Sequence, residues 1–203
     1  YAALSGVTSE GYNTAVGHQA GEEVIGAYNV LLGRNAGNES GDIDHCIAIG
    51  YDALGSANLD CGENVAIGSH ALQNQTTGNG RFLAVGKSCL EDMTTGSENT
   101  GMGWYALADC TTGEQNTAIG RHAMRKNIGG HYNTAVGFNS LEENTSANVN
   151  TAIGYAALRK NTSGTYNAAG GAYSIQNNTT GSYNTGFGYG TLADNTTGYS
   201  NTA

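Results

Sequence analysis

Short segments of alternating large and small residues return along this chain at a nearly constant spacing. The clearest copies follow the pattern Asn-Thr-Ala-Ile/Val-Gly at residues 13–17, 116–120, 133–137 and 150–154, and seven weaker copies end at other glycines. The eleven glycines that end these copies are separated by 16, 17, 18 and 18 residues, and then six times by 17. Alternation over a few residues is typical of a β-strand, and a short, steady period is typical of a solenoid in which each repeat forms one coil. We therefore predict a short strand just before the glycine of each repeat.

Two columns of large apolar residues follow from this alignment. One precedes the repeat glycine, and the other, mostly Leu, comes four positions after it, in a segment that we predict to be a second short strand. We expect these columns to form the core ladder of the solenoid: Val16, Ile49, Ile67, Val85, Ile119, Val136 and Ile153, with Leu54, Leu72, Leu107, Leu158 and Leu192.

A small residue, usually Ala, separates the two larger residues of the first strand. Its size indicates close packing, against either another strand of the coil or another chain. Each coil offers only about three sizeable apolar side chains. So thin a core favours association of several copies, and we expect a homotrimer.

The remaining positions fit an all-β chain. An Asn-Thr-Thr-Gly turn closes many repeats, and both Asn and Gly suit the positive φ of such turns. No sustained helical period is present. We predict a parallel β-solenoid of about twelve 17-residue coils, forming a single repeat array over residues 1–203. Because the sequence begins and ends within a repeat, we expect it to be a piece of a longer chain.

Composition narrows the class of partner. The 203 residues include 32 Gly, no Pro and 12% charged residues, and the net charge is −9. Without Pro, no strand loses a ladder hydrogen bond. The acidic balance and the lack of a basic patch argue against a nucleic-acid partner. No apolar run is long enough to predict a direct membrane segment.

The array Asn-Thr-Ala-Ile-Gly-Tyr-x-Ala-Leu-x-x-Asn-Thr-Thr-Gly, clearest from Asn116 to Thr202, resembles the repeats of bacteriophage tail-fibre and related surface-fibre proteins. Its Ala-Ile-Gly element is also similar to the head repeats of trimeric autotransporter adhesins, which use shorter coils of about 14 residues. The resemblance implies a trimeric fibre on a virion or cell surface, outside the cell. The sequence departs from those adhesins in showing no stalk or anchor segment.

Several residues suggest modification or binding. The Asn-x-Ser/Thr pattern marks possible N-glycosylation, although Asn-Thr-Thr is also ordinary turn chemistry. These asparagines are Asn38, Asn74, Asn144, Asn161, Asn178 and Asn195. Aromatic residues recur after the repeat glycine and before the Asn. They could stack on cell-surface glycans or form a ladder among themselves.

Cysteine and acidic residues gather in the irregular early coils. Cys46 and Cys61 lie near the same predicted bend, which suggests a disulfide. If the array binds a ligand, we expect the site near Asp42, Asp44 and Asp60. No metal-ligand spacing and no catalytic motif stands out, so we predict no metal, no cofactor and no enzymatic activity.

Three functions remain open at this point. The first is a non-catalytic shaft or spacer of a trimeric fibre. The second is a filament subunit whose coils stack end to end with those of the next copy. The third is a solenoid that binds glycan or ice.

Overall fold

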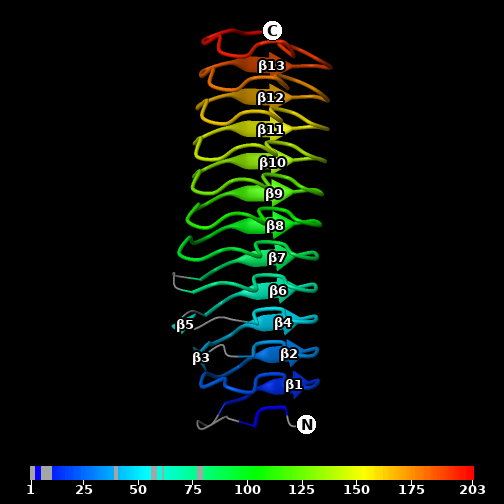
Figure 1. Ribbon diagram of the computed structural model, residues 1–203, viewed down its shortest axis with the longest axis vertical. Coiled ribbons are helices and arrows are strands. Elements are labelled where there is room, and N and C mark those ends of the chain that lie inside the picture. The colour runs from blue at the N-terminus through cyan, green and yellow to red at the C-terminus, as the bar shows by residue number, and fades with distance from the viewer. Residues whose placement is uncertain (1–2, 6–10, 39–40, 56–58, 61, 77–79) are drawn as a thin grey trace.

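The computed structural model is an all-β parallel solenoid, in which strands stack along one long axis with the two termini at opposite ends (Figure 1). It describes the chain except residues 1–2, 6–10, 39–40, 56–58, 61 and 77–79. No helix occurs in this described part. The strands are β1 (Thr14–Val16), β2 (Val30–Leu32), β3 (Gly41–Asp42), β4 (Ile47–Ile49), β5 (Leu59–Asp60), β6 (Val65–Ile67), β7 (Leu83–Val85), β8 (Thr100–Met102), β9 (Thr117–Ile119), β10 (Thr134–Val136), β11 (Thr151–Ile153), β12 (Ala168–Gly170) and β13 (Thr185–Phe187).

Eleven of these strands form one parallel sheet in sequence order, with β3 and β5 left to a small second sheet. The register never slips, so Ala118 pairs with Ala135, and Ala135 with Ala152. Equivalent residues of successive coils therefore form straight columns along the axis. This confirms the predicted all-β parallel solenoid and the strand expected just before each repeat glycine.

The alternation within each strand is opposite to the prediction. The central alanine is buried inside the coil, as at Ala48, Ala118 and Ala152. The residue before the glycine points out of the coil and is exposed at Val16, Ile67, Ile119 and Ile153, and half-buried at Ile49, Val85 and Val136. The expected core ladder is thus wrong for this column, because the interior beside the leucine column has room at the strand for only a small side chain.

The leucine column fills that interior. Leu54, Leu72, Leu107 and Leu158 are completely buried, and Leu192 is partly buried. The segment is not the second strand that we expected: it is a turn in which this column has φ between 48° and 57°. A non-glycine residue is strained in that region, so burial of the large side chain offsets the backbone cost.

The repeat glycines sit where two coils touch. From Gly17 to Gly171 their φ lies between 121° and 141°, and an added Cβ would come within 2.3–2.6 Å of the next repeat glycine's carbonyl oxygen. No L side chain fits this space. The steady glycine period therefore reflects a backbone contact that is made once per coil.

Two ladders of buried asparagine join the coils from inside. In the first, Asn133 donates from its backbone N–H and from Nδ2 to Asn116 Oδ1, at 2.9 and 3.1 Å. Asn133 Nδ2 also donates to the Ala147 carbonyl, at 2.8 Å. In the second ladder, Asn144 Nδ2 donates to Asn127 Oδ1 at 2.6 Å and to the same Ala147 carbonyl. Each rung satisfies polar groups that burial would otherwise make costly.

Departures from the consensus compensate one another in volume. Cys89 takes the place of an inner alanine, and Gly101 opposite it lacks a side chain, so a Cβ there would lie 2.5 Å from Cys89 Sγ. Leu31 occupies an alanine position in β2, and its side chain fills the space that Gly21 and Gly37 leave at the leucine positions. The interior thus keeps its density through paired changes.

Candidate functional site

The largest candidate surface is the outer side of the eleven-stranded sheet, formed by the first and third residue of each three-residue strand. We call it the outer face. Its third-position column contains Val16, which is 64% exposed, and Ile153, which is 50% exposed. The register places Ile119, Val136 and Ile153 directly above one another. A continuous apolar strip therefore runs along the solenoid, where isolated exposed apolar residues would be unremarkable.

No position of the outer face carries a charge. Its first-position column is Thr in β1, Val, Ile or Leu from β2 to β7, and mostly Thr from β8 onward, as at Thr100, Thr117 and Thr134. The sequence placed these threonines in the strand, but on the side expected to face the core. The face is therefore apolar from β2 to β7 and mixed apolar and hydroxyl from β8 onward.

One pair of residues on the outer face compensates in volume. Gly170 stands in β12 where other strands carry Val or Ile, and an added Cβ would meet the Phe187 ring of β13. The ring thus folds over the gap that the glycine leaves. Phe187 itself remains 65% exposed.

A second feature is the corner column, made of the residues that directly follow the repeat glycines. Trp104, Arg121 and Phe138 occupy it in three successive coils. The Arg121 guanidinium carbon lies 4.7 Å from the Trp104 ring centroid and 5.5 Å from that of Phe138. Phe138 in turn stacks on Tyr155, with centroids 5.2 Å apart. The sequence analysis noted the aromatic residues but missed Arg121, although its 17-residue spacing from both rings was the available signal.

The aromatic column before the ladder asparagine stacks on itself. Tyr166 and Tyr183 have ring centroids 5.0 Å apart and an interplanar angle of 5°, and Tyr12, Tyr28 and His45 stack in the same way. The rings within each stack face one another, as expected if the aromatic residues form a ladder among themselves.

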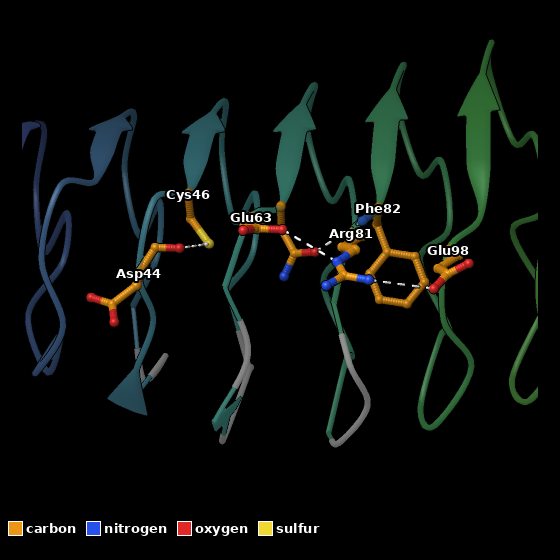
Figure 2. Close-up of polar contacts among 7 residues, drawn as sticks. Asp44, Cys46, Glu63, Arg81, Phe82 and Glu98 are labelled. Atoms are coloured by element: carbon orange, nitrogen blue, oxygen red, sulfur yellow. Dashed lines mark hydrogen bonds and ion pairs between the residues drawn. The ribbon is translucent and has the colours of Figure 1, made fainter.

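A shallow recess of about 260 Å³ opens beside this column, lined by Asp44, His45, Gly62, Glu63 and Arg81. It lies where the asparagine ladder is interrupted, because Cys46 and Phe82 stand at ladder positions (Figure 2). Both keep the backbone part of the ladder: the Cys46 N–H donates to Asn29 Oδ1 at 2.8 Å, and the Phe82 N–H to Asn64 Oδ1 at 3.0 Å.

The charges of the recess are used within the chain. Arg81 lies 3.3 Å from Glu63 and 3.6 Å from Glu98, and it bridges two coils (Figure 2). Asp44 Oδ1 accepts the Ala27 N–H at 2.6 Å. These acidic side chains therefore make hydrogen bonds and ion pairs between coils. The expected ligand site near Asp42, Asp44 and Asp60 thus gains no support from the recess, and the Asp60 side chain lies outside the described residues.

The possible glycosylation sites fall into two groups. Asn144, Asn161 and Asn178 are completely buried rungs of the second asparagine ladder, and each Nδ2 donates two hydrogen bonds. A glycan on these nitrogens is incompatible with the folded coil, so the prediction is wrong for them. Asn195 Nδ2 is used in the same way at the end of the ladder. Asn38 and Asn74 are half-buried outside the ladders, and for them glycosylation stays a prediction.

The cysteines give no metal or redox site that can be described. Cys89 and Cys110 are buried free thiols, and burial raises their pKa to about 12 and about 11. Cys46 is buried, and its Sγ donates to the Asp44 carbonyl at 3.4 Å. The proposed pairing of Cys46 with Cys61 is untested, because Cys61 lies outside the described residues.

Within the described ranges, no helix could cross a membrane and no three His, Cys, Asp or Glu side chains gather around a common point. The outer face, the corner column and the recess are therefore the surfaces on which a function can be argued. Comparison of the chain with protein-family models, with curated proteins and with solved structures found no match.

Proposed function

We propose that this chain is a non-catalytic structural shaft, a spacer within an extracellular, cell-surface or virion fibre, and that copies associate through the outer face as a homotrimer. The observation that carries the proposal is an uncharged apolar strip on all eleven strands of a solenoid whose own interior is already filled. The resemblance of the repeat to fibre repeats agrees with it. The chemistry of the shaft is that of packing, with no reacting group.

The outer face is of moderate size. Eleven strands about 4.8 Å apart, each about 10 Å long, give a flat footprint of roughly 500 Å², including its Thr column. That lies within the range of the largest patches on ordinary monomers, about 300–600 Å², so the absence of charge, and not the area, supports the proposal. Around a three-fold axis each face meets two neighbours, and the in-register columns run along that axis.

The experiment is the native mass of the chain, measured by light scattering and native mass spectrometry, with a charge placed on the face. We expect a trimer for the wild type and a monomer for Ile153→Asp. Ile128→Asp is the matched control, since Ile128 lies in a turn away from the face and is 52% exposed against 50% for Ile153. It should remain trimeric. Circular dichroism checks that both variants keep the β-solenoid.

The alternatives give different results in the same measurement. A series of ever larger species that Ile153→Asp does not change would indicate a filament instead of a trimer. A wild-type monomer would refute association through the outer face. If that monomer also showed thermal hysteresis in freezing solutions, the Thr column of β8 to β11 would become an ice-binding surface.

A further inference from the structure

The corner column contains an arginine that is held in place but not neutralised. Arg121 takes part in no ion pair within the described ranges, whereas Arg81, Arg125 and Arg159 each lie within 4.0 Å of a carboxylate. Its guanidinium is sandwiched between Trp104 and Phe138. The two rings hold the guanidinium from either side, at 4.7 and 5.5 Å, and its N–H donors remain exposed to solvent. The sandwich thus presents an ordered fork of donors to solvent.

The coil that carries Arg121 is positive, whereas the coils of Trp104 and Phe138 on either side each contain two acidic residues. The coil from Arg121 to Gly137 contains Arg125 and Lys126 as well, and no Asp or Glu, while the whole chain has a net charge of −9. The pKa of His122 is lowered, first by its burial and then by the nearby Arg121 and Arg125. The nearest acids belong to neighbouring coils. Asp109 lies by Arg125, and Glu142 is bonded to Arg159 at 2.8 Å.

We propose that Arg121, with Trp104 and Phe138, forms a binding site for the carboxylate of an acidic saccharide. A carboxylate matches the guanidinium edge through two parallel hydrogen bonds. The Trp104 ring, which is 44% exposed, offers apolar surface beside it for the C–H groups of a sugar ring. A nucleic acid fits less well, since the net charge of the chain repels an extended polyanion. The proposal does not rest on the shaft function.

Trp104 is the single tryptophan of the chain, so its fluorescence reports on this site alone. The experiment titrates the full chain with a short oligomer of galacturonic acid and follows emission, with calorimetry as an independent readout. We expect saturation with a dissociation constant on the order of 1 mM. A neutral glucose oligomer and acetate should each bind more weakly, which separates the saccharide from either half of its chemistry.

Variants test the role of the guanidinium. Arg121→Ala should weaken binding by roughly 10- to 100-fold, the range for a hydrogen bond to a charged group. Arg121→Lys, which keeps the charge without the fork, should fall between it and the wild type. Arg81→Ala is the control: it removes an exposed arginine that is already paired with Glu63 and Glu98.

The proposal is overturned if the wild type gives neither heat nor a fluorescence change, or if Arg81→Ala weakens binding as much as Arg121→Ala. If acetate bound as tightly as the galacturonic acid oligomer, the site would recognise only a carboxylate, and the proposal of a saccharide ligand would be overturned. Unfolding curves of the variants show whether each remains folded. The readout applies to any oligomeric state, so its failure leaves the shaft proposal standing.

Discussion

The volume pairing of Cys89 and Gly101 can be tested by a double-mutant cycle. Gly101→Ala alone places a methyl group 2.5 Å from Cys89 Sγ, and such overpacking costs about 1–3 kcal/mol of unfolding free energy. The gain from replacing a strand glycine, roughly 0.5–1 kcal/mol, offsets part of this. Cys89→Ala alone removes a buried sulfur atom and leaves a small cavity, at a cost of about 1–2 kcal/mol.

The double variant restores the Ala-Ala pair that another coil already uses at Ala106 and Ala118. We therefore expect its stability to lie within about 1 kcal/mol of the wild type, with a coupling energy of roughly 1–3 kcal/mol. Urea unfolding, followed by Trp104 fluorescence next to β8, measures all four proteins. If the two single changes simply add, within about 0.5 kcal/mol, the two side chains do not share one space and the reasoning is refuted.

Three further predictions concern the ladder, the glycine contact and a buried thiol. Asn133→Ala should lower the unfolding free energy by about 2–4 kcal/mol, because it breaks several buried hydrogen bonds. Asn74→Ala, outside the ladders, should cost under about 1 kcal/mol. Equal losses of the two variants in urea unfolding would contradict the ladder. Gly120→Ala, which meets a carbonyl oxygen at 2.5 Å, should abolish the fold by circular dichroism, whereas Gly190→Ala, with φ 65° and open space, should cost only about 1 kcal/mol. Burial raises the pKa of the Cys89 thiol from 9.0 to about 12. The contribution of this thiol to stability is therefore complete below pH 9 and is lost as the pH rises toward 12. A pH series of urea unfolding, compared with Cys89→Ala, should show this loss, and rapid alkylation of Cys89 in the folded chain at pH 8 would argue against it.

The period of the sequence was sufficient to predict the fold, because each repeat glycine marks the same backbone contact and each strand the same register. It was not sufficient to decide which side of the strand faces inward. Alternation gives two faces without naming the inner one. The deciding quantity is volume: a coil that already holds Leu158 has room at the strand for Ala152 but not for Ile153.

The residues that depart from the consensus were harder to interpret. Taken alone, Asn144 and Asn161 match a glycosylation pattern, and only the stacked structure shows that both are buried rungs. Gly21 stands at a leucine position by its spacing from the repeat glycine, and Leu31 fills the space from the side. Such compensations join different repeat positions 6 to 12 residues apart, so comparing the same position between repeats does not reveal them.

The absence of charge on the outer face needs an explanation of its own. In-register stacking alone does not forbid charged columns, because this chain builds them by alternating sign: Glu63, Arg81 and Glu98 follow one another in one column, and Glu142 pairs with Arg159 one coil away. Columns of alternating charge could form in the same way on the outer face, but no strand carries a charged residue there. Solvent exposure gives no reason for avoiding such pairs, since ion pairs at a surface cost little. Burial against another apolar surface does give a reason, because a charge left there without a partner is costly. The contrast between the columns therefore favours an outer face that is covered in the working protein, and it is this covering that Ile153→Asp should disrupt.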